Sequence, residues 1–311
     1  MKEMEIFGLL TAEVGKLFLM MLLGFLMYRR HVLSVEESKV ISKLLLYIVL
    51  PCVVFHSFCV EFTMDKARGL VLAYAAAAVI SLSLVGLVTL LMKPLRLTTV
   101  EEMNILYFNT GIVVPIVISA FGREYVMYAT GMIFVHTILV WTHCSSRLSG
   151  HPHVNWKKVL CNPNLLCMAV GFVLLLANIQ LPVVLSGTIE AVAGLFGPLS
   201  MIVTGVLVGS VSWKKMRSYR RLPLIVLLRM VAAPLFAIFL LKVTHAELLA
   251  PDGTNILLIV LLAVATNAGS TVTQMVQLYG GDAEYSSIIC AVTSVLSIVA
   301  LPVFGALFEI L

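Results

Sequence analysis

A chain of 311 residues in which 60% are hydrophobic and only 12% are charged does not have the composition of a soluble globular protein. Its formal net charge of +5 comes from basic residues spread over several short loops, so we expect no nucleic-acid partner. A helix that crosses a bilayer needs about 20 mostly apolar residues. The sequence therefore predicts an all-α polytopic membrane protein surrounded by membrane lipid.

Apolar segments long enough to cross the bilayer follow one another along the whole chain. They lie near residues 6–28, 39–59, 69–92, 104–121, 125–143, 163–180, 185–212, 222–241, 254–279 and 284–309. A basic and polar connection at residues 143–163 separates the first five segments from the last five. We therefore expect ten transmembrane helices in two units, residues 1–150 and 151–311.

Basic residues are unevenly divided between the loops on the two sides of these segments. The loops after the first, third, fifth and seventh segments contain Arg29, Arg30, Lys39, Lys93, Arg96, Arg147, Lys157, Lys158, Lys214, Lys215, Arg217, Arg220 and Arg221. The N-terminus and the loops on the other side contain Lys2, Lys66, Arg68, Arg123 and Lys242. Because Lys and Arg are enriched in cytoplasmic loops, we expect both termini to lie outside the cell membrane, whether plasma or inner membrane.

The fourth and ninth segments share a sequence pattern. Asn109-Thr110-Gly111 corresponds to Asn267-Ala268-Gly269, and an aromatic residue and a glycine follow at the same offset, as Phe121-Gly122 and Tyr279-Gly280. An acidic residue comes two positions after each of these glycines. Since five is an odd number, the second unit enters the membrane from the opposite side. The shared pattern therefore predicts an inverted repeat.

Both of these segments contain residues that weaken a helix, and the ninth contains a run of hydroxyl and amide side chains. Broken helices in a membrane must line a cavity enclosed by protein, and the N-terminus of a half-helix attracts an anion. The predicted substrate-binding residues are Asn109, Thr110, Gly111, Pro115, Asn267, Gly269, Ser270, Thr271 and Gln274. We expect Asn109 and Asn267 to face one cavity from opposite sides. The alternative is that these polar groups only hold helices together.

Other features leave the coupling of transport open. The C-terminal carbonyl groups of the first half-helices could bind Na⁺, and His56, His136 or His143 could carry a proton. Arg229 is the arginine that lies well inside a segment. It could attract an anion on the cytoplasmic side, extend towards the membrane interface, or pair with a carbonyl freed by Pro234.

Residues 279–282, Tyr-Gly-Gly-Asp, resemble the Gly-x-Gly-Asp motif of intramembrane aspartyl proteases. Tyr279 stands where that motif needs glycine, however, and the remaining aspartates, Asp65 and Asp252, lie in loops. Nucleotide-binding and zinc-protease motifs are also missing from the sequence. We therefore expect a secondary transporter without enzymatic activity and without a cofactor. A receptor or a channel is the alternative.

The sequence resembles the auxin efflux carrier family of membrane transporters over nearly its whole length. The resemblance lies in the stretches "LLLYIVLPCVVF", "NTGIVVPIVISAFG", "NPNLLCMAVGFVLLLANIQLP", "GPLSMIVTGVLVG" and "SVLSIVALPVFG". It implies two inverted five-helix repeats in which segments 4 and 9 cross. Segments 1, 2, 6 and 7 would form a scaffold, and the others a moving core.

The resemblance also implies a small organic anion as substrate, such as auxin or a dicarboxylate, carried by alternating access. The long cytoplasmic loop of many plant members is missing, which favours a compact, bacterial-type carrier. A homodimer formed through the scaffold is implied as well, and the glycines of the seventh segment permit close helix contacts. These glycines are Gly194, Gly197, Gly205 and Gly209.

Overall fold

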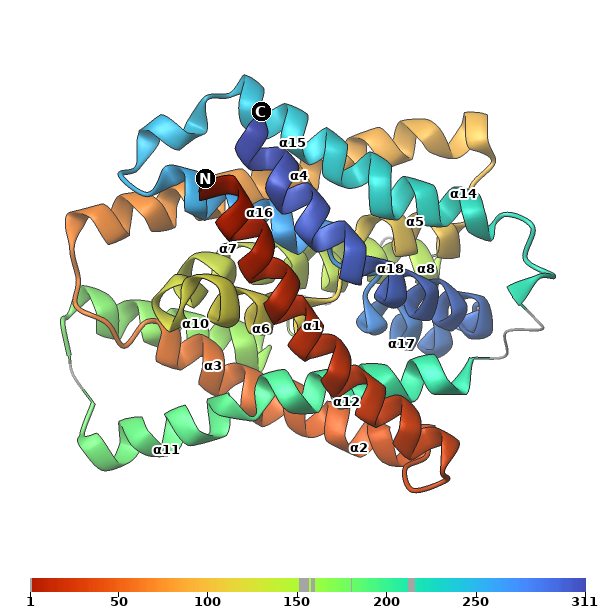
Figure 1. Cartoon of the computed structure of the whole chain (residues 1–311), viewed down its shortest axis with the longest axis horizontal. Helices are drawn as coiled ribbons and strands as arrows, with labels where there is room; N and C mark the ends of the chain where they lie inside the picture. The colour runs from red at the N-terminus through yellow and green to blue at the C-terminus, as the bar shows by residue number, and fades with distance from the viewer. Residues whose placement is uncertain (1, 151–156, 158–159, 180, 212–215) are drawn as a thin grey trace.

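The computed structural model of the chain describes residues 2–150, 157, 160–179, 181–211 and 216–311. Its helices, in chain order, are α1 (Lys2–Arg29), α2 (Val35–Leu44), α3 (Leu50–Ser57), α4 (Met64–Leu95), α5 (Thr99–Leu106), α6 (Thr110–Phe121), α7 (Val126–Leu139), α8 (Ser145–Ser149), α10 (Pro163–Leu176), α11 (Val183–Gly194), α12 (Phe196–Ser210), α14 (Leu222–Leu227), α15 (Ala233–Val243), α16 (Gly253–Ala265), α17 (Ser270–Leu278) and α18 (Ala283–Ile310) (Figure 1). Short π-helical turns, η1 (Leu45–Val49), η3 (Val140–Cys144) and η4 (Leu228–Ala232), and 3-10 turns, η2 (Arg123–Tyr125) and η5 (Ala246–Leu249), join some of them. The described part of the chain contains no β-strand, in agreement with the all-α prediction.

Six continuous helical stretches in the described part are long and apolar enough to cross a membrane. They are Val35–Ser57, Met64–Leu95, Arg123–Ser149, Val183–Ser210, Leu222–Val243 and Ala283–Ile310. The shorter apolar helices are Ile112–Phe121, Pro163–Leu176 and Gly253–Ala265. Together with α1, these helices occupy every apolar segment that the sequence predicts. The fourth and ninth segments are each broken into two shorter helices.

The start of the fourth segment was predicted too late, at residue 104, whereas α5 begins at Thr99. The charged Glu101 and Glu102 made this stretch resemble a loop. In the structure the Thr98 side chain accepts a hydrogen bond from the Glu101 N–H, and the Glu101 carboxylate accepts one from the Thr98 N–H. This reciprocal cap satisfies two donors that would otherwise be unpaired, so the helix begins before the apolar run does.

Two of the π-helical turns come just before a proline. Pro51 follows η1 and Pro234 follows η4, each by two residues. Proline has no N–H, and its ring clashes with the carbonyl four residues earlier. That carbonyl belongs to Tyr47 in η1 and to Met230 in η4, so the wider turn removes the clash without ending the helix. Arg229 also lies in η4, and its surroundings are described below.

Helices α1 and α12 cross in direct backbone contact (Figure 1). A Cβ atom on Gly24 of α1 would lie 2.0 Å from a main-chain oxygen of α12, and one on Gly205 would lie 1.9 Å from the carbonyl oxygen of Met21. A Cβ on Gly209 would come within 3.0 Å of the Tyr28 ring. Gly205 and Gly209 therefore serve packing inside one chain. They cannot serve the contact between two copies that the sequence analysis assigned to them.

We expect Gly205→Ala to destabilise the protein by about 1–3 kcal/mol, because the added methyl group must push the two backbones apart. Thermal unfolding of the purified protein in lipid nanodiscs measures this loss. Gly86→Ala is the matched control: Gly86 is exposed on α4, and no atom lies within 4 Å of its added Cβ. Equal melting temperatures for the two variants would contradict the contact.

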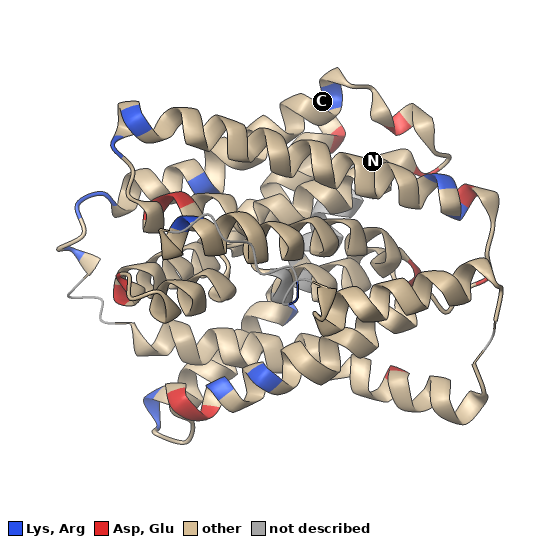
Figure 2. Cartoon of the chain, turned by 180° about the vertical axis from the view of Figure 1, so that it is seen from behind, with Lys and Arg blue, Asp and Glu red and all other residues tan. Residues whose placement is uncertain are grey.

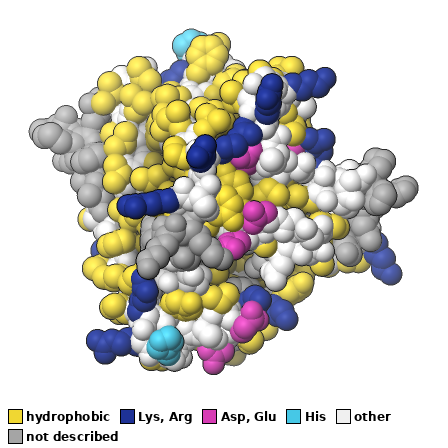
Figure 3. Space-filling model, turned by 90° about the vertical axis from the view of Figure 1, so that its right-hand side faces the viewer, with side chains coloured by type: hydrophobic (Ala, Val, Ile, Leu, Met, Phe, Trp, Pro, Cys, Tyr) yellow, Lys and Arg dark blue, Asp and Glu magenta, His cyan; other side chains and the backbone are white. Residues whose placement is uncertain are grey.

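Lys and Arg lie mostly at one end of the molecule, on the left in Figure 2. Figure 3 looks onto this end and shows basic side chains spread around it, with acidic side chains between them. It is the end at which α4 finishes and α14 begins. The orientation prediction assigns this end to the cytoplasm.

Candidate functional site

The two broken helices meet at their breaks and are joined there by main-chain hydrogen bonds. The Asn109 N–H donates to the Asn267 carbonyl at 3.0 Å, and the Gly269 N–H donates to the Tyr107 carbonyl at 2.9 Å. These bonds make an isolated antiparallel bridge at Phe108 and Ala268. We call this arrangement the crossing. Each break thus provides hydrogen-bond partners for backbone N–H and carbonyl groups of the other. Inside a membrane such groups need partners within the protein.

Gly269 is needed at the crossing for space. A Cβ on this residue would lie 2.7 Å from the Phe108 carbonyl oxygen. Its φ of −70° is one that other residues also adopt, so a special backbone conformation is not the reason. On the other side, the Ala268 N–H donates to the Thr293 hydroxyl of α18 at 3.1 Å. Hydrogen bonds therefore join the two breaks to each other, and the break in the ninth segment is also bonded to α18.

A cavity of about 50 Å³ lies against the crossing, and four of the predicted site residues line it. They are Asn109, Ser270, Thr271 and Gln274. Residues of α2, η1, α3 and α12 line the rest. We call this space the crossing cavity. None of the described residues around it is charged, so this space offers hydrogen bonds and helix dipoles instead of a fixed charge.

The remaining predicted site residues lie elsewhere. Asn267 is fully buried and its amide donates to the Ser294 hydroxyl of α18 at 2.7 Å. It therefore does not face the crossing cavity from the side opposite Asn109, as the sequence analysis expected. The direction of its side chain follows from the local backbone of the break, which the repeat pattern alone did not reveal. Pro115 lines a different cavity, and the surroundings of the Thr110 side chain and of Gly111 lie outside the described part of the structure.

A much larger cavity, of about 650 Å³, adjoins the crossing cavity and shares Leu46, Leu50 and Thr271 with it. We call it the wide cavity. It lies at the end of α7 that leads into η3, and Trp141 and Lys157 are among its lining residues. This is the basic end of the molecule. The wide cavity therefore gives a ligand from that end access to Thr271.

A third cavity, of about 180 Å³, lies at the opposite end of α7 and is lined by Pro115, Arg123 and Val126. We call it the narrow cavity. The Arg123 guanidinium forms an ion pair with Glu190 of α11. The pair therefore joins η2 to α11 beside this cavity. The cavity at this end is therefore smaller than the wide cavity at the basic end.

A family model described as "Membrane transport protein" matches residues 9–150 and 152–305. The chain belongs to this family. It is the auxin efflux carrier family to which the sequence showed its resemblance. No curated protein matches the sequence. The protein is therefore a membrane transporter, and its apolar helices make it a multi-pass membrane protein.

The described residues include a buried cation for which the sequence analysis left three roles open. Arg229 is fully buried, and its guanidinium donates to the carbonyl oxygens of Ile105, Thr266 and Asn267 at 3.3, 2.8 and 3.4 Å. It pairs with carbonyls, as one of the alternatives held, but these belong to the two broken helices and not to the turn before Pro234. Its burial shows that it does not extend towards the membrane interface. The signal in the sequence was an arginine inside an apolar segment.

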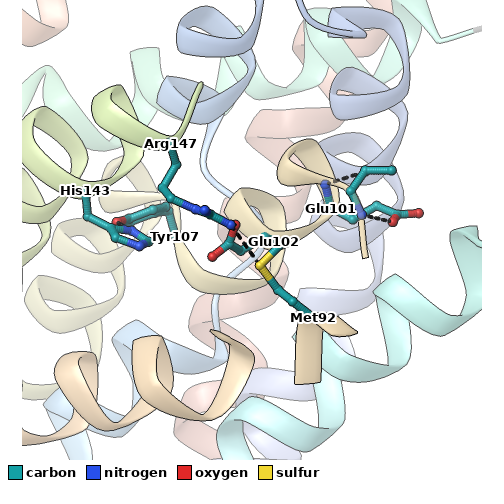
Figure 4. A network of polar contacts seen from close by, with 7 residues as sticks. Met92, Glu101, Glu102, Tyr107, His143 and Arg147 are labelled. Atoms are coloured by element: carbon teal, nitrogen blue, oxygen red, sulfur yellow. Dashed lines mark hydrogen bonds and ion pairs between the residues drawn. The ribbon is translucent and has the colours of Figure 1, made fainter. Parts of the chain in front are cut away.

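Sequence analysis also missed a pair of buried carboxylates at the basic end (Figure 4). The Glu102 side chain is fully buried and accepts hydrogen bonds from Arg147 at 2.8 and 3.1 Å. Glu101 lies 3.4 Å from Arg221 and accepts a hydrogen bond from the Tyr285 hydroxyl at 3.2 Å. These contacts tie the start of α5 to α8, α14 and α18. The Thr98-x-x-Glu101 cap was the local signal that this stretch is helical.

A hydrogen bond also connects the crossing to the basic end. The Tyr107 backbone belongs to the crossing, and its hydroxyl lies 2.8 Å from Nδ1 of His143 (Figure 4). The neighbouring His136 packs on the Phe108 ring with 4.3 Å between ring centroids and lines the wide cavity. Two of the three histidines considered for proton transfer therefore lie beside the crossing, and His56 lines the narrow cavity.

Proposed function

We propose that the protein is a secondary transporter that carries a small, carboxylate-bearing organic anion by alternating access. The observation that carries this proposal is the crossing cavity. Residues with amide and hydroxyl side chains line it, and two half-helices, α6 and α17, begin beside it. The family membership supports transport in general, and the chemistry of this cavity supports an anion.

The ends of the half-helices supply the attraction for the anion. Helix N-termini present unpaired N–H groups and the positive end of the helix dipole. Helix α17 begins without a side-chain cap, so no capping side chain competes with a ligand for this helix end. Asn109, Ser270 and Thr271 add neutral hydrogen-bonding groups. Such a set can bind a carboxylate and release it again, because none of the described residues that line the cavity is charged.

Alternating access is supported by the unequal cavities. The crossing cavity, at about 50 Å³, holds water but not an organic anion together with its hydration. A ligand that enters through the wide cavity can therefore occupy the site only when the walls of α2, η1, α3 and α12 move relative to the crossing. At the other end, the ion pair between Arg123 and Glu190 joins η2 to α11 beside the narrow cavity. In the opposite state, the wide cavity would close and this pair would open.

The architecture of the proposal follows the sequence analysis. It contains two inverted five-helix repeats, residues 1–150 and 151–311, with both termini outside the cell membrane. The repeated Asn-x-Gly pattern and the charge distribution of the loops support it. A scaffold that includes α1 and α12 is supported by their backbone contact. The proposed homodimer rests on the family resemblance and on the exposed apolar residues of α10 and α11, such as Val173 and Val183.

Uptake into proteoliposomes tests the proposed function. A thermal-shift screen with mono- and dicarboxylates first selects ligands, since a compound that binds the native state raises its melting temperature. We then expect saturable uptake of a selected carboxylate and no uptake of an amine of similar size. Uptake that rises linearly with concentration would indicate a channel. If no carboxylate shifts the melting temperature or is taken up, the proposed substrate class is wrong.

A further inference from the structure

Arg229 occupies an unusual electrostatic position. Its carbonyl partners are main-chain groups at the C-terminal ends of α5 and α16. Within the described part of the chain, it forms no ion pair with a carboxylate. A fully buried guanidinium that remains charged needs compensation. Here the two helix ends provide it.

The opposite charges in this arrangement are of similar size, although Nε of Arg229 is buried without a hydrogen-bond partner. Each helix C-terminus carries a partial charge of about −0.5, concentrated on its last unpaired carbonyls. Two such ends amount to about one negative charge, which equals the single positive charge of the arginine. The planar guanidinium has several donors in a fixed fork, so it can reach Ile105 of α5 and Thr266 beyond α16 at the same time. A lysine, with one nitrogen, could not span both equally well.

Carbonyl groups at broken-helix ends are also the groups that coordinate Na⁺ in transporters with interrupted helices. We propose that Arg229 is a tethered cation that neutralises the carbonyl ends of α5 and α16 and thereby takes the place of a coupling metal ion at the crossing. The positive ends of α6 and α17 then remain available for the anion whether or not Na⁺ is present. The consequence for transport rests on the proposed function. If the protein carries a carboxylate, we expect the uptake of that carboxylate to be independent of Na⁺.

Melting temperatures test the proposal without any substrate. The full-length protein in nanodiscs is heated in equal concentrations of sodium chloride and choline chloride. We expect the same melting temperature for the wild type in both salts. A higher melting temperature in sodium chloride would overturn the proposal, because a metal ion would then still bind to the native state.

Variants of Arg229 test the role of the charge. Arg229→Met removes the charge but keeps most of the volume, and Arg229→Ala also leaves space beside the carbonyls. We expect both to melt below the wild type. We expect low concentrations of guanidinium or Na⁺ to restore part of the loss in Arg229→Ala but not in Arg229→Met. Arg220→Met, a change at an exposed arginine, is the matched control and should melt like the wild type in every salt.

Each contrary result has a clear meaning. An Arg229→Met variant as stable as the wild type would show that the carbonyl ends need no cation. If neither guanidinium nor Na⁺ raises the melting temperature of Arg229→Ala, Arg229 contributes only packing and the proposal is wrong. If Arg229→Ala does not fold, Arg229→Lys replaces it. This variant keeps a cation, so a melting temperature no higher than that of Arg229→Met would overturn the proposal.

The uptake assay separates this inference from the proposed function. Carboxylate uptake that persists at an unchanged rate when choline replaces Na⁺ on both sides supports both. Uptake that requires Na⁺ overturns the inference and leaves the proposed function intact. If no carboxylate is taken up in either salt, the proposed function fails, while the melting results still decide whether Arg229 replaces a metal ion.

Discussion

Asn109→Ala is expected to weaken carboxylate binding roughly ten- to a hundredfold, and Asn109→Asp to weaken it further. Asn109 lines the crossing cavity beside the start of α6. Loss of a hydrogen bond to a charged ligand costs about 1.5–3 kcal/mol. The aspartate variant adds a negative charge that repels the anion where water is largely excluded. Titration of the carboxylate selected by thermal shift, against the protein in nanodiscs, measures both changes.

Two further variants make this result specific. Asn178→Asp is the matched control, since Asn178 is exposed beyond the end of α10, and its affinity should equal that of the wild type. Asn267→Ala should lower the melting temperature and change the carboxylate affinity little, because the Asn267 amide donates a hydrogen bond to Ser294 and does not face the crossing cavity. A folded Asn109→Ala variant with unchanged affinity would exclude the crossing cavity as the binding site.

Arg147→Met is expected to destabilise the transporter by about 3 kcal/mol. The change leaves the Glu102 carboxylate fully buried without its two hydrogen-bond donors. Removal of one partner of a buried ion pair typically costs about 3–5 kcal/mol. We expect the lower end of this range because the Arg147 side chain is 41% exposed and water can replace part of it. Equilibrium unfolding in mixed micelles measures the loss.

A double variant separates charge from packing. Glu102→Gln removes the buried charge, so Arg147→Met combined with Glu102→Gln should recover much of the stability lost in Arg147→Met. Lys39→Met is the matched control, because its ion pair with Glu36 is exposed and worth less than about 1 kcal/mol. If the double variant is as unstable as the sum of the two single variants, the ion pair does not contribute and the prediction is wrong.

Much of the fold could be predicted from the sequence because apolar length and helix breaks are local properties. Each predicted segment contains a helix, and both predicted breaks are observed, since Gly269 and the neighbouring polar residues weaken the helix where they stand. The start of α5 was missed because its carboxylates are compensated by Arg147 and Arg221, which are distant in the sequence. Ion pairs between residues that are distant in the sequence cannot be recognised from the apolar residues of a single segment.

The candidate site was predicted only in part for a related reason. Asn109, Ser270, Thr271 and Gln274 line one cavity, and their role in substrate binding stays a prediction. The repeat pattern treated Asn109 and Asn267 as equivalent, yet the second lies against Ser294, whose hydroxyl accepts its amide. A shared sequence pattern fixes the position of a residue along the chain. The direction of its side chain depends on neighbours from other helices.

Main-chain hydrogen bonds hold the crossing together, and this determines which amino-acid substitutions the transporter can accept there. The hydrogen bonds between the two breaks involve N–H and carbonyl groups that every residue except proline provides. Of the residues in the crossing, Gly269 is constrained by its lack of a Cβ. Residues 109, 270, 271 and 274 line the cavity. If the crossing cavity binds the substrate as proposed, we expect substitutions at these four positions to alter ligand preference while the crossing stays intact. They are then the starting points for engineering a carrier with a new substrate.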